Sequence, residues 1–128
     1  MNFDHPIVVL KNGLRVVNFS SPHPFVFDDG SELPAVPGEV SRHLMLEQSE
    51  VEHNRGSYFD VRLSFQMSGA IRVMLEKLVN NTEVDIIIVP FPVMEACKSC
   101  NFDLRCKIKV CRVKDRVTKV IWSNRFCV

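Results

Sequence analysis

The stretch YFDVRLSFQMSGAIRVMLEKLVN, residues 58–80, changes its hydrophobic period half-way, and this change is the clearest structural signal in the chain. Over Tyr58–Met67, apolar and polar residues alternate, which is typical of a β-strand with one buried face and one wet face. Beyond Ser68, apolar residues recur three and four positions apart, which predicts an amphipathic helix over residues 69–80. The Ser68 hydroxyl can cap the first turn of that helix.

Turn signals divide the rest of the chain into short segments. Asn12–Gly13 separates two apolar runs, which is the strongest short signal of a β-hairpin. Glu47–Gly56 is polar and predicts a loop. Val84–Val89 is apolar almost throughout, which predicts a central strand that is covered on both faces. Leu104–Val113 and Arg116–Ser123 predict a closing β-hairpin.

The composition is that of one globular domain. The chain has 128 residues, of which 46% are hydrophobic and 24% are charged, and these values argue against wholesale disorder. No apolar run approaches the ~20 residues of a membrane helix, so we expect no membrane contact. We therefore predict a single α+β domain over residues 1–128. It should have a mostly antiparallel sheet, one main helix packed on one face, and a C-terminal β-hairpin.

Five cysteines bear on the cellular compartment and on metal binding. An odd count, behind a start that lacks a basic signal region, predicts reduced thiols and a cytoplasmic location. Cys97 and Cys100 have a spacing that can hold zinc. Cys106 and Cys111 lie five apart on a predicted strand and point to opposite faces. We therefore expect no metal and no cofactor, with Cys97 and Cys100 as a metal-binding or redox pair left as the alternative.

The net charge of +1 conceals a strong asymmetry along the chain. Residues 1–97 carry 7 basic and 13 acidic side chains, whereas residues 98–128 carry 9 basic and 2 acidic ones. Such a division indicates an anionic partner for the basic segment, or an attraction between the two segments within the fold. Both interpretations stay open at this point.

A row of cations in the basic segment is a candidate interface. Arg105, Lys107 and Lys109 share one face of the predicted strand, and Arg112 follows. This set, the basic row, can follow the phosphates of a nucleic acid, with an affinity that falls as salt rises. Trp122 can add a stacking surface. The alternative is a solvated outer face on which lysines protect an edge strand.

The loop Asn18–Pro24 is a candidate ligand site. His23 lies between two prolines and therefore has little backbone freedom, and Asn18 and Ser20 supply hydrogen-bond donors and acceptors. Histidine can bind phosphate, ligate a metal or move a proton. The spacing of these residues matches no hydrolase signature, so we assign no catalytic residue. The alternative is a loop histidine that is satisfied by its neighbours.

Val16–Phe25 resembles the opening of small, uncharacterised bacteriophage proteins, in which a valine-rich strand precedes Asn-Leu-Thr-Pro-His-Pro. Arg42 follows a Pro-Gly turn, as an arginine does in that group, and Val84–Pro90 resembles their late apolar strand. This chain departs from the pattern by one extra serine and by a phenylalanine in place of leucine. The resemblance implies a viral or phage accessory protein and no known reaction. It implies that Asn18, His23 and Arg42 are site residues.

Together these patterns predict a non-catalytic accessory protein that binds an anionic ligand, such as a nucleotide, through Asn18, Ser20, His23 and Arg42. The chain has no glycine-rich phosphate loop. One alternative is a nucleic-acid-binding module that uses the basic row. Another is a small enzyme in which His23 acts as acid or base. An exposed edge strand equally allows a homodimer.

Overall fold

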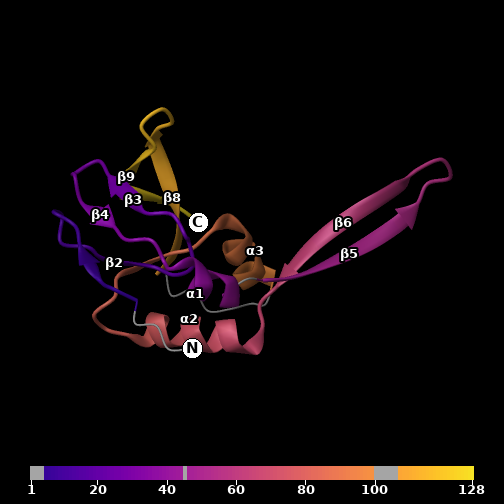
Figure 1. Ribbon diagram of the computed structural model, residues 1–128, viewed down its shortest axis with the longest axis horizontal. Helices are drawn as coiled ribbons and strands as arrows, with labels where there is room; N and C mark the ends of the chain where they lie inside the picture. Colours follow the sequence, from indigo (N-terminus) through magenta and orange to yellow (C-terminus); the bar gives the residue numbers. More distant parts are fainter. Residues whose placement is uncertain (1–4, 45, 100–106) are drawn as a thin grey trace.

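The computed structural model describes residues 5–44, 46–99 and 107–128, which form a body with one long projecting hairpin (Figure 1). Seven strands of the body form one mixed sheet in the order β1-β2-β7-β8-β9-β3-β4. The strands are β1 (Val8–Val9), β2 (Arg15–Asn18), β3 (Phe25–Phe27), β4 (Glu32–Leu33), β7 (Ile86–Ile88), β8 (Ile108–Asp115) and β9 (Val120–Cys127).

The body sheet combines parallel and antiparallel pairs. Strand β7 pairs in parallel with β2 and β8, and β3 pairs in parallel with β9. The pairs β1–β2, β3–β4 and β8–β9 are antiparallel. Parallel neighbours need crossover connections, and helix α3 (Phe91–Ser99) supplies the one between β7 and β8.

The sheet curls until its two ends nearly meet. Strand β4 comes into contact with β2, and Asn18 Nδ2 donates a hydrogen bond to the Pro34 carbonyl at 3.2 Å. The result is a nearly closed, barrel-like sheet. It encloses an inner core of Leu10, Val16, Phe27, Leu33, Ile86, Ile88 and Ile121.

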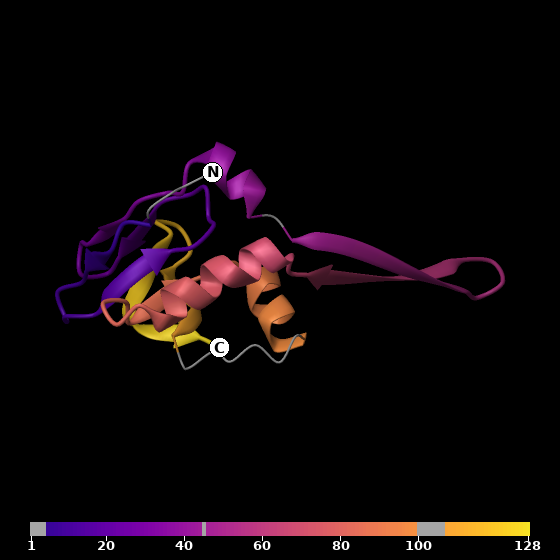
Figure 2. The ribbon, with the colours of Figure 1, turned by 90° about the horizontal axis from the view of Figure 1, so that it is seen from below.

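A second core lies outside the barrel, beneath the helices. Alternation along the strands separates the two cores: Val16 and Ile86 point inward, whereas Val17 and Ile87 point outward. Helices α1 (Gly38–His43), α2 (Gly69–Asn80) and α3 lie against the outer face of the barrel (Figure 2). In the described residues, no helix is long and apolar enough to cross a membrane.

The two strongest local predictions are confirmed. Helix α2 spans the predicted residues, and Ser68 Oγ accepts a hydrogen bond from the Ile71 amide at 3.3 Å. The predicted hairpin at Asn12–Gly13 joins β1 to β2, with Gly13 at a φ of 91°. The central apolar strand is also present, and its described extent is β7.

The predicted fold class is wrong. The described chain is 40% strand and 23% helix, with three short helices instead of one main helix on a sheet. The sheet is mixed, not mostly antiparallel. The physical reason is that parallel neighbours are distant in sequence, so hydrophobic period and turn residues carry no signal of their pairing. The closing hairpin turns at residues 116–119, further along the chain than the gap between the predicted strands Leu104–Val113 and Arg116–Ser123.

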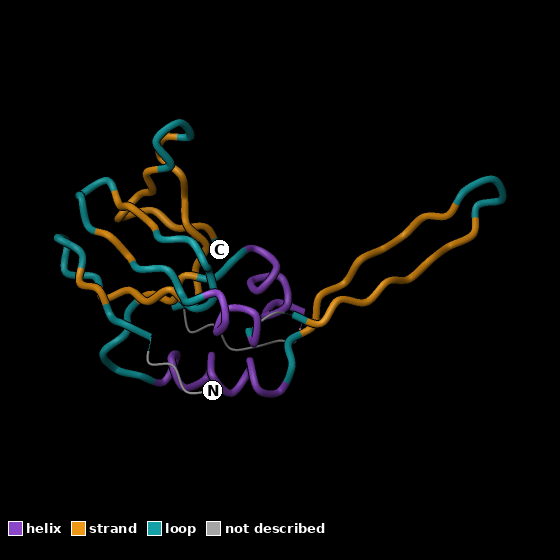
Figure 3. Tube along the Cα trace, in the orientation of Figure 1, coloured by secondary structure: helices purple, strands orange, loops and turns teal. Residues whose placement is uncertain are grey.

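The projecting hairpin, the arm, corrects two further expectations (Figure 3). Glu47–Gly56 is not a loop, because strand β5 (Glu47–Asn54) pairs along its whole length with β6 (Phe59–Gln66). Strand β6 has the predicted alternation, but most of its apolar face is exposed instead of buried. In the part of the chain that the structure describes, the arm is anchored at its base, where Leu46 and Met67 pack against the outer core.

Candidate functional site

The barrel opens at one end into a cavity of about 580 Å³, here called the mouth pocket. Its lining comes from β3, β8, β9 and the segments beside them: His23, Pro24, Phe25, Cys111, Val113, Arg116, Lys119 and Ile121. Three of these side chains, Phe25, Cys111 and Ile121, also belong to or pack against the inner core. The pocket is therefore an opening of the barrel interior, of a size typical of small-molecule sites.

Irregular pairing between β8 and β9 shapes this opening. Cys111 pairs with Phe126 and Val113 pairs with Ile121, so β9 has several more residues than β8 between these two pairs. Extra residues of this kind bend a strand and interrupt its ladder. The bend leaves Val113 48% exposed at the rim of the pocket while Ile121 is almost fully buried in its floor.

A hydrogen-bonded loop carries His23 at the rim. The Ser21 hydroxyl accepts a hydrogen bond from the His23 amide at 3.2 Å. Asn18, only 2% exposed, fixes this loop through its amide side chain. Its Oδ1 accepts from the Ser21 amide at 3.0 Å, and its Nδ2 donates to the carbonyls of Ser21 and Pro34 at 3.0 and 3.2 Å. Asn18 is therefore a positioning residue for the His23 loop.

Arg116 and Lys119 enter the pocket from the turn between β8 and β9. Asp115 Oδ1 accepts hydrogen bonds from the amides of Val117 and Thr118, and these bonds lower the pKa of Asp115. Lys119 adopts a φ of 60°, in the left-handed region that favours glycine. The turn thus carries a cation at a position where glycine would be sterically easier.

The structure does not bring the four predicted ligand residues together. Of Asn18, Ser20, His23 and Arg42, only His23 lines the mouth pocket. Ser20 lines a separate cavity of about 280 Å³ beside the base of the arm. Arg42 lies on α1, where its Nε donates to the Gly38 carbonyl at 3.3 Å. Sequence reasoning missed Arg116 and Lys119 as partners of His23, because the contact between their segments depends on the parallel pairing of β3 with β9.

The basic row is dispersed. Arg105 lies outside the described residues. Lys107 directly precedes β8. Its ammonium donates to the carbonyls of Val79 and Asn81 at 2.9 and 3.1 Å, at the C-terminal end of α2. Lys109 is half-buried in β8, and Arg112 is exposed further along that strand.

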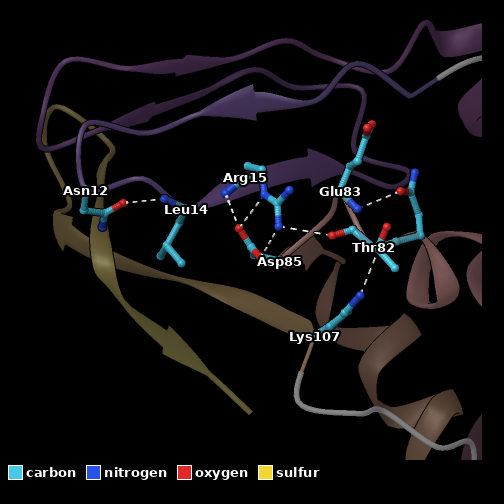
Figure 4. Close-up of polar contacts among 8 residues, drawn as sticks. Asn12, Leu14, Arg15, Thr82, Glu83, Asp85 and Lys107 are labelled. Atoms are coloured by element: carbon cyan, nitrogen blue, oxygen red, sulfur yellow. Dashed lines mark hydrogen bonds and ion pairs between the residues drawn. The ribbon is translucent and has the colours of Figure 1, made fainter.

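A polar cluster at the start of β2 and β7 has a structural role (Figure 4). Arg15 Nε and Nη2 donate to the two carboxylate oxygens of Asp85, each at 3.0 Å, and Nη2 also donates to the Thr82 carbonyl. The hydrogen bond from the Arg15 side chain is the main reason that the pKa of Asp85 falls to about 2. These hydrogen bonds join Arg15 on β2 to Asp85, which directly precedes β7, so the cluster holds the two strands together.

A cation–aromatic cluster lies on the β8–β9 hairpin. Lys114 Nζ lies 4.7 Å from the centre of the Trp122 ring, and Arg125 Cζ lies 4.2 Å from it. Lys114 Nζ is also 3.8 Å from an Asp28 carboxylate oxygen. This last contact is an attraction between the acidic and basic segments of the chain. The sequence marked Trp122 as a stacking surface but gave no signal of these neighbours.

The cysteines form no metal site in the part of the chain that the structure describes. Cys97 is fully buried in the outer core, and the predicted partners Cys100 and Cys106 lie outside the described residues. Cys111 is in the floor of the mouth pocket. Burial, and secondarily the nearby Cys127, raise the pKa of the Cys111 thiol to about 12. A thiol with such a pKa stays protonated at neutral pH and is a poor nucleophile.

Comparison with family models, with curated proteins and with solved structures finds no match to this chain.

Proposed function

We propose that the protein is a phage-type accessory protein that binds a small anionic ligand in the mouth pocket, without catalysis. The ligand has an apolar or aromatic body and the size of a nucleotide. The single observation behind this proposal is that His23, Arg116 and Lys119 line one cavity whose floor is apolar. Apolar pockets with a few convergent polar groups are the usual form of small-molecule sites.

The two strong cations are available to a ligand. Within the described ranges, the side chains of Arg116 and Lys119 make no ion pair and no hydrogen bond. The neighbouring acid Asp115 is turned toward the backbone of its own turn and does not line the pocket. A guanidinium suits two-point contact with phosphate or carboxylate, and an ammonium adds a mobile positive charge.

The floor favours a ligand with a flat apolar part. Phe25 offers an aromatic surface, and Ile121 and Val113 add apolar lining. Burial of such a body supplies affinity, while the cations at the rim fix its orientation. A bare inorganic anion would use only the rim and should bind more weakly.

The test is a calorimetric titration with adenosine monophosphate, inorganic phosphate and adenosine as three separate probes. We expect adenosine monophosphate to bind most tightly. Lys119→Gly and Arg116→Ala should each weaken that binding about tenfold, the effect of one lost charge-assisted hydrogen bond. Arg42→Ala, an exposed cation on α1, is the matched control and should bind like the parent chain. Equal binding by all three variants would overturn the proposal.

Nucleic acid is a second candidate ligand because of the cluster around Trp122. An aromatic ring with two cations within 5 Å resembles the stacking platforms that hold single strands. Trp122 is the single tryptophan of the chain, so its fluorescence reports this surface alone. Quenching by an oligothymidylate, with an affinity that falls steeply as salt rises, would support this function. An unchanged spectrum at low salt would exclude it.

A further inference from the structure

The arm presents one face with a distinctive pattern. In antiparallel strands, residues that pair directly point to the same side of the ribbon. Phe59, Val61 and Leu63 of β6 therefore share a face, and they are 59%, 51% and 49% exposed. Their partners across the ribbon on β5 are Asn54, Glu52 and Glu50. This apolar and acidic surface is here called the arm face.

Nothing in the described part of the same chain covers the arm face. The arm extends away from the body in two perpendicular views (Figures 1 and 2). An isolated two-stranded hairpin is only marginally stable in water, and exposed apolar stripes on such ribbons promote association. Glu50 and Glu52 form no ion pair within the described residues. The arm face therefore lacks both an apolar cover and counter-charges.

A complementary surface exists elsewhere on the molecule. The outer half of the β8–β9 hairpin, residues 112–120, projects from the body and is exposed except at its last residue. It presents two exposed valines, Val113 and Val117, at 48% and 90% exposure. Its charged side chains are Arg112, Lys114, Asp115, Arg116 and Lys119. Arg112 and Lys114 alternate with Val113 along β8 and do not share its face, so the groups that match the arm face are these two cations and the exposed Val117 of the turn.

The two surfaces belong to different ends of the molecule. The arm points away from the body, whereas the β8–β9 hairpin projects from the barrel in another direction (Figure 1). Within one chain the two surfaces do not face each other (Figure 1). A second copy of the chain supplies the missing surface directly.

We propose that the arm face of one copy docks on the outer β8–β9 hairpin of a second copy. Burial of the β6 stripe supplies the affinity, and Glu50 and Glu52 meet the basic side chains, which sets the orientation. Because the two surfaces differ, the contact is head-to-tail. Repetition of such a contact gives a ring or an open chain of copies.

The test is sedimentation velocity of the whole chain over a range of protein and salt concentrations. We expect reversible association that weakens as salt rises. Val61→Thr keeps a strand-forming residue but removes apolar contact, and should weaken association by about fivefold. Val51→Thr is the matched control, since Val51 is 50% exposed and lies on the opposite face of the arm. Equal association of the two variants would overturn the proposal.

A charge-exchange experiment tests the identity of the occupant. Glu50→Lys with Glu52→Lys makes one variant, and Arg112→Glu with Lys114→Glu makes the other; neither alters the lining of the mouth pocket. Each variant alone should be monomeric, and their equimolar mixture should associate, which also shows that both are folded. Association of the glutamate variant by itself, as strong as that of the parent chain, would indicate arm-to-arm pairing, because its arm is unchanged, and would contradict head-to-tail docking. A mixture that stays monomeric would overturn the proposal. Adenosine monophosphate binding by each variant is measured in a separate titration, so that failure of docking and failure of the proposed function can be distinguished.

Discussion

Strands β6 and β7 have equally strong hydrophobic patterns and opposite surroundings. The three isoleucines of β7 are each 8% exposed or less, because β2 and β8 flank the strand and a core lies on each face. In β6, Val61 and Leu63 remain about half exposed in perfect alternation with polar residues. The pattern of a strand identifies its faces, but it does not tell whether the same chain provides their cover.

The largest expected difference between the two strands is in stability. Ile87→Ala removes a fully buried side chain from the outer core and should lower the free energy of unfolding by about 2–5 kcal/mol. Leu63→Ala in the arm should change it by less than about 0.5 kcal/mol in the monomer. Urea denaturation at low protein concentration measures both. Similar losses would show that the arm is part of the cooperative body.

Asn18→Ala should have the next largest effect. The substitution removes three hydrogen bonds of a buried amide and leaves the Ser21 amide without its side-chain acceptor. We expect a loss of about 1–3 kcal/mol in stability, together with weaker adenosine monophosphate binding because the His23 loop loses its support. Ser49→Ala in the arm, whose hydroxyl contacts that of Ser64 at an exposed site, is the matched control and should leave both measurements unchanged. Unaltered binding by Asn18→Ala would contradict its positioning role.

The two regions should also differ in how an ion pair responds to acid. The pKa of Asp85 falls from 3.8 to about 2, so its pairing with Arg15 stabilises the fold above pH 3.8. This contribution is lost as the pH falls through about 2. Asp85→Asn should therefore be less stable than the parent chain near neutral pH, and the difference should vanish near pH 2. Asp60→Asn, which breaks the exposed Arg55–Asp60 pair of the arm, should leave thermal unfolding unchanged.

The smallest expected effect is a gain in stability at the mouth. Lys119→Gly relieves a left-handed φ of 60° and should stabilise the body by about 0.5–1 kcal/mol while it weakens anion binding. Lys114→Gly at an extended position of β8 is the comparison and should be destabilising. Thermal unfolding in the absence of nucleotide measures both. A loss of stability in Lys119→Gly would show that the turn does not carry strain.

Local structure could be predicted from the sequence where neighbours along the chain determine it. Helix α2 follows from the spacing of Ile71, Met74, Leu75 and Leu78 and from the Ser68 cap. The turn at Gly13 follows from its freedom to adopt positive φ. Strand β5 was missed because its residues are nearly all polar, and the strand that pairs with it among the described residues is β6 across the turn.

The barrel and the mouth pocket could not be predicted, because both depend on strand order. Parallel pairing places β3 beside β9, and this contact brings His23 near Arg116 and Lys119 across more than ninety residues of sequence. Nothing in the pattern of either segment specifies the other. Of the residues in the Asn18–Pro24 loop that the sequence marked as ligand contacts, His23 lines the mouth pocket. Its predicted companions Asn18 and Ser20 instead hold the loop and line a neighbouring cavity.

Hydrogen exchange of backbone amides at two protein concentrations tests most directly whether the arm is the uncovered half of an interface. Amides of β7 should be strongly protected at both concentrations, because the core covers them on both faces. Amides of β5 and β6 should exchange rapidly in dilute protein and become protected in concentrated protein at low salt. Arm amides whose protection does not depend on concentration would contradict the account.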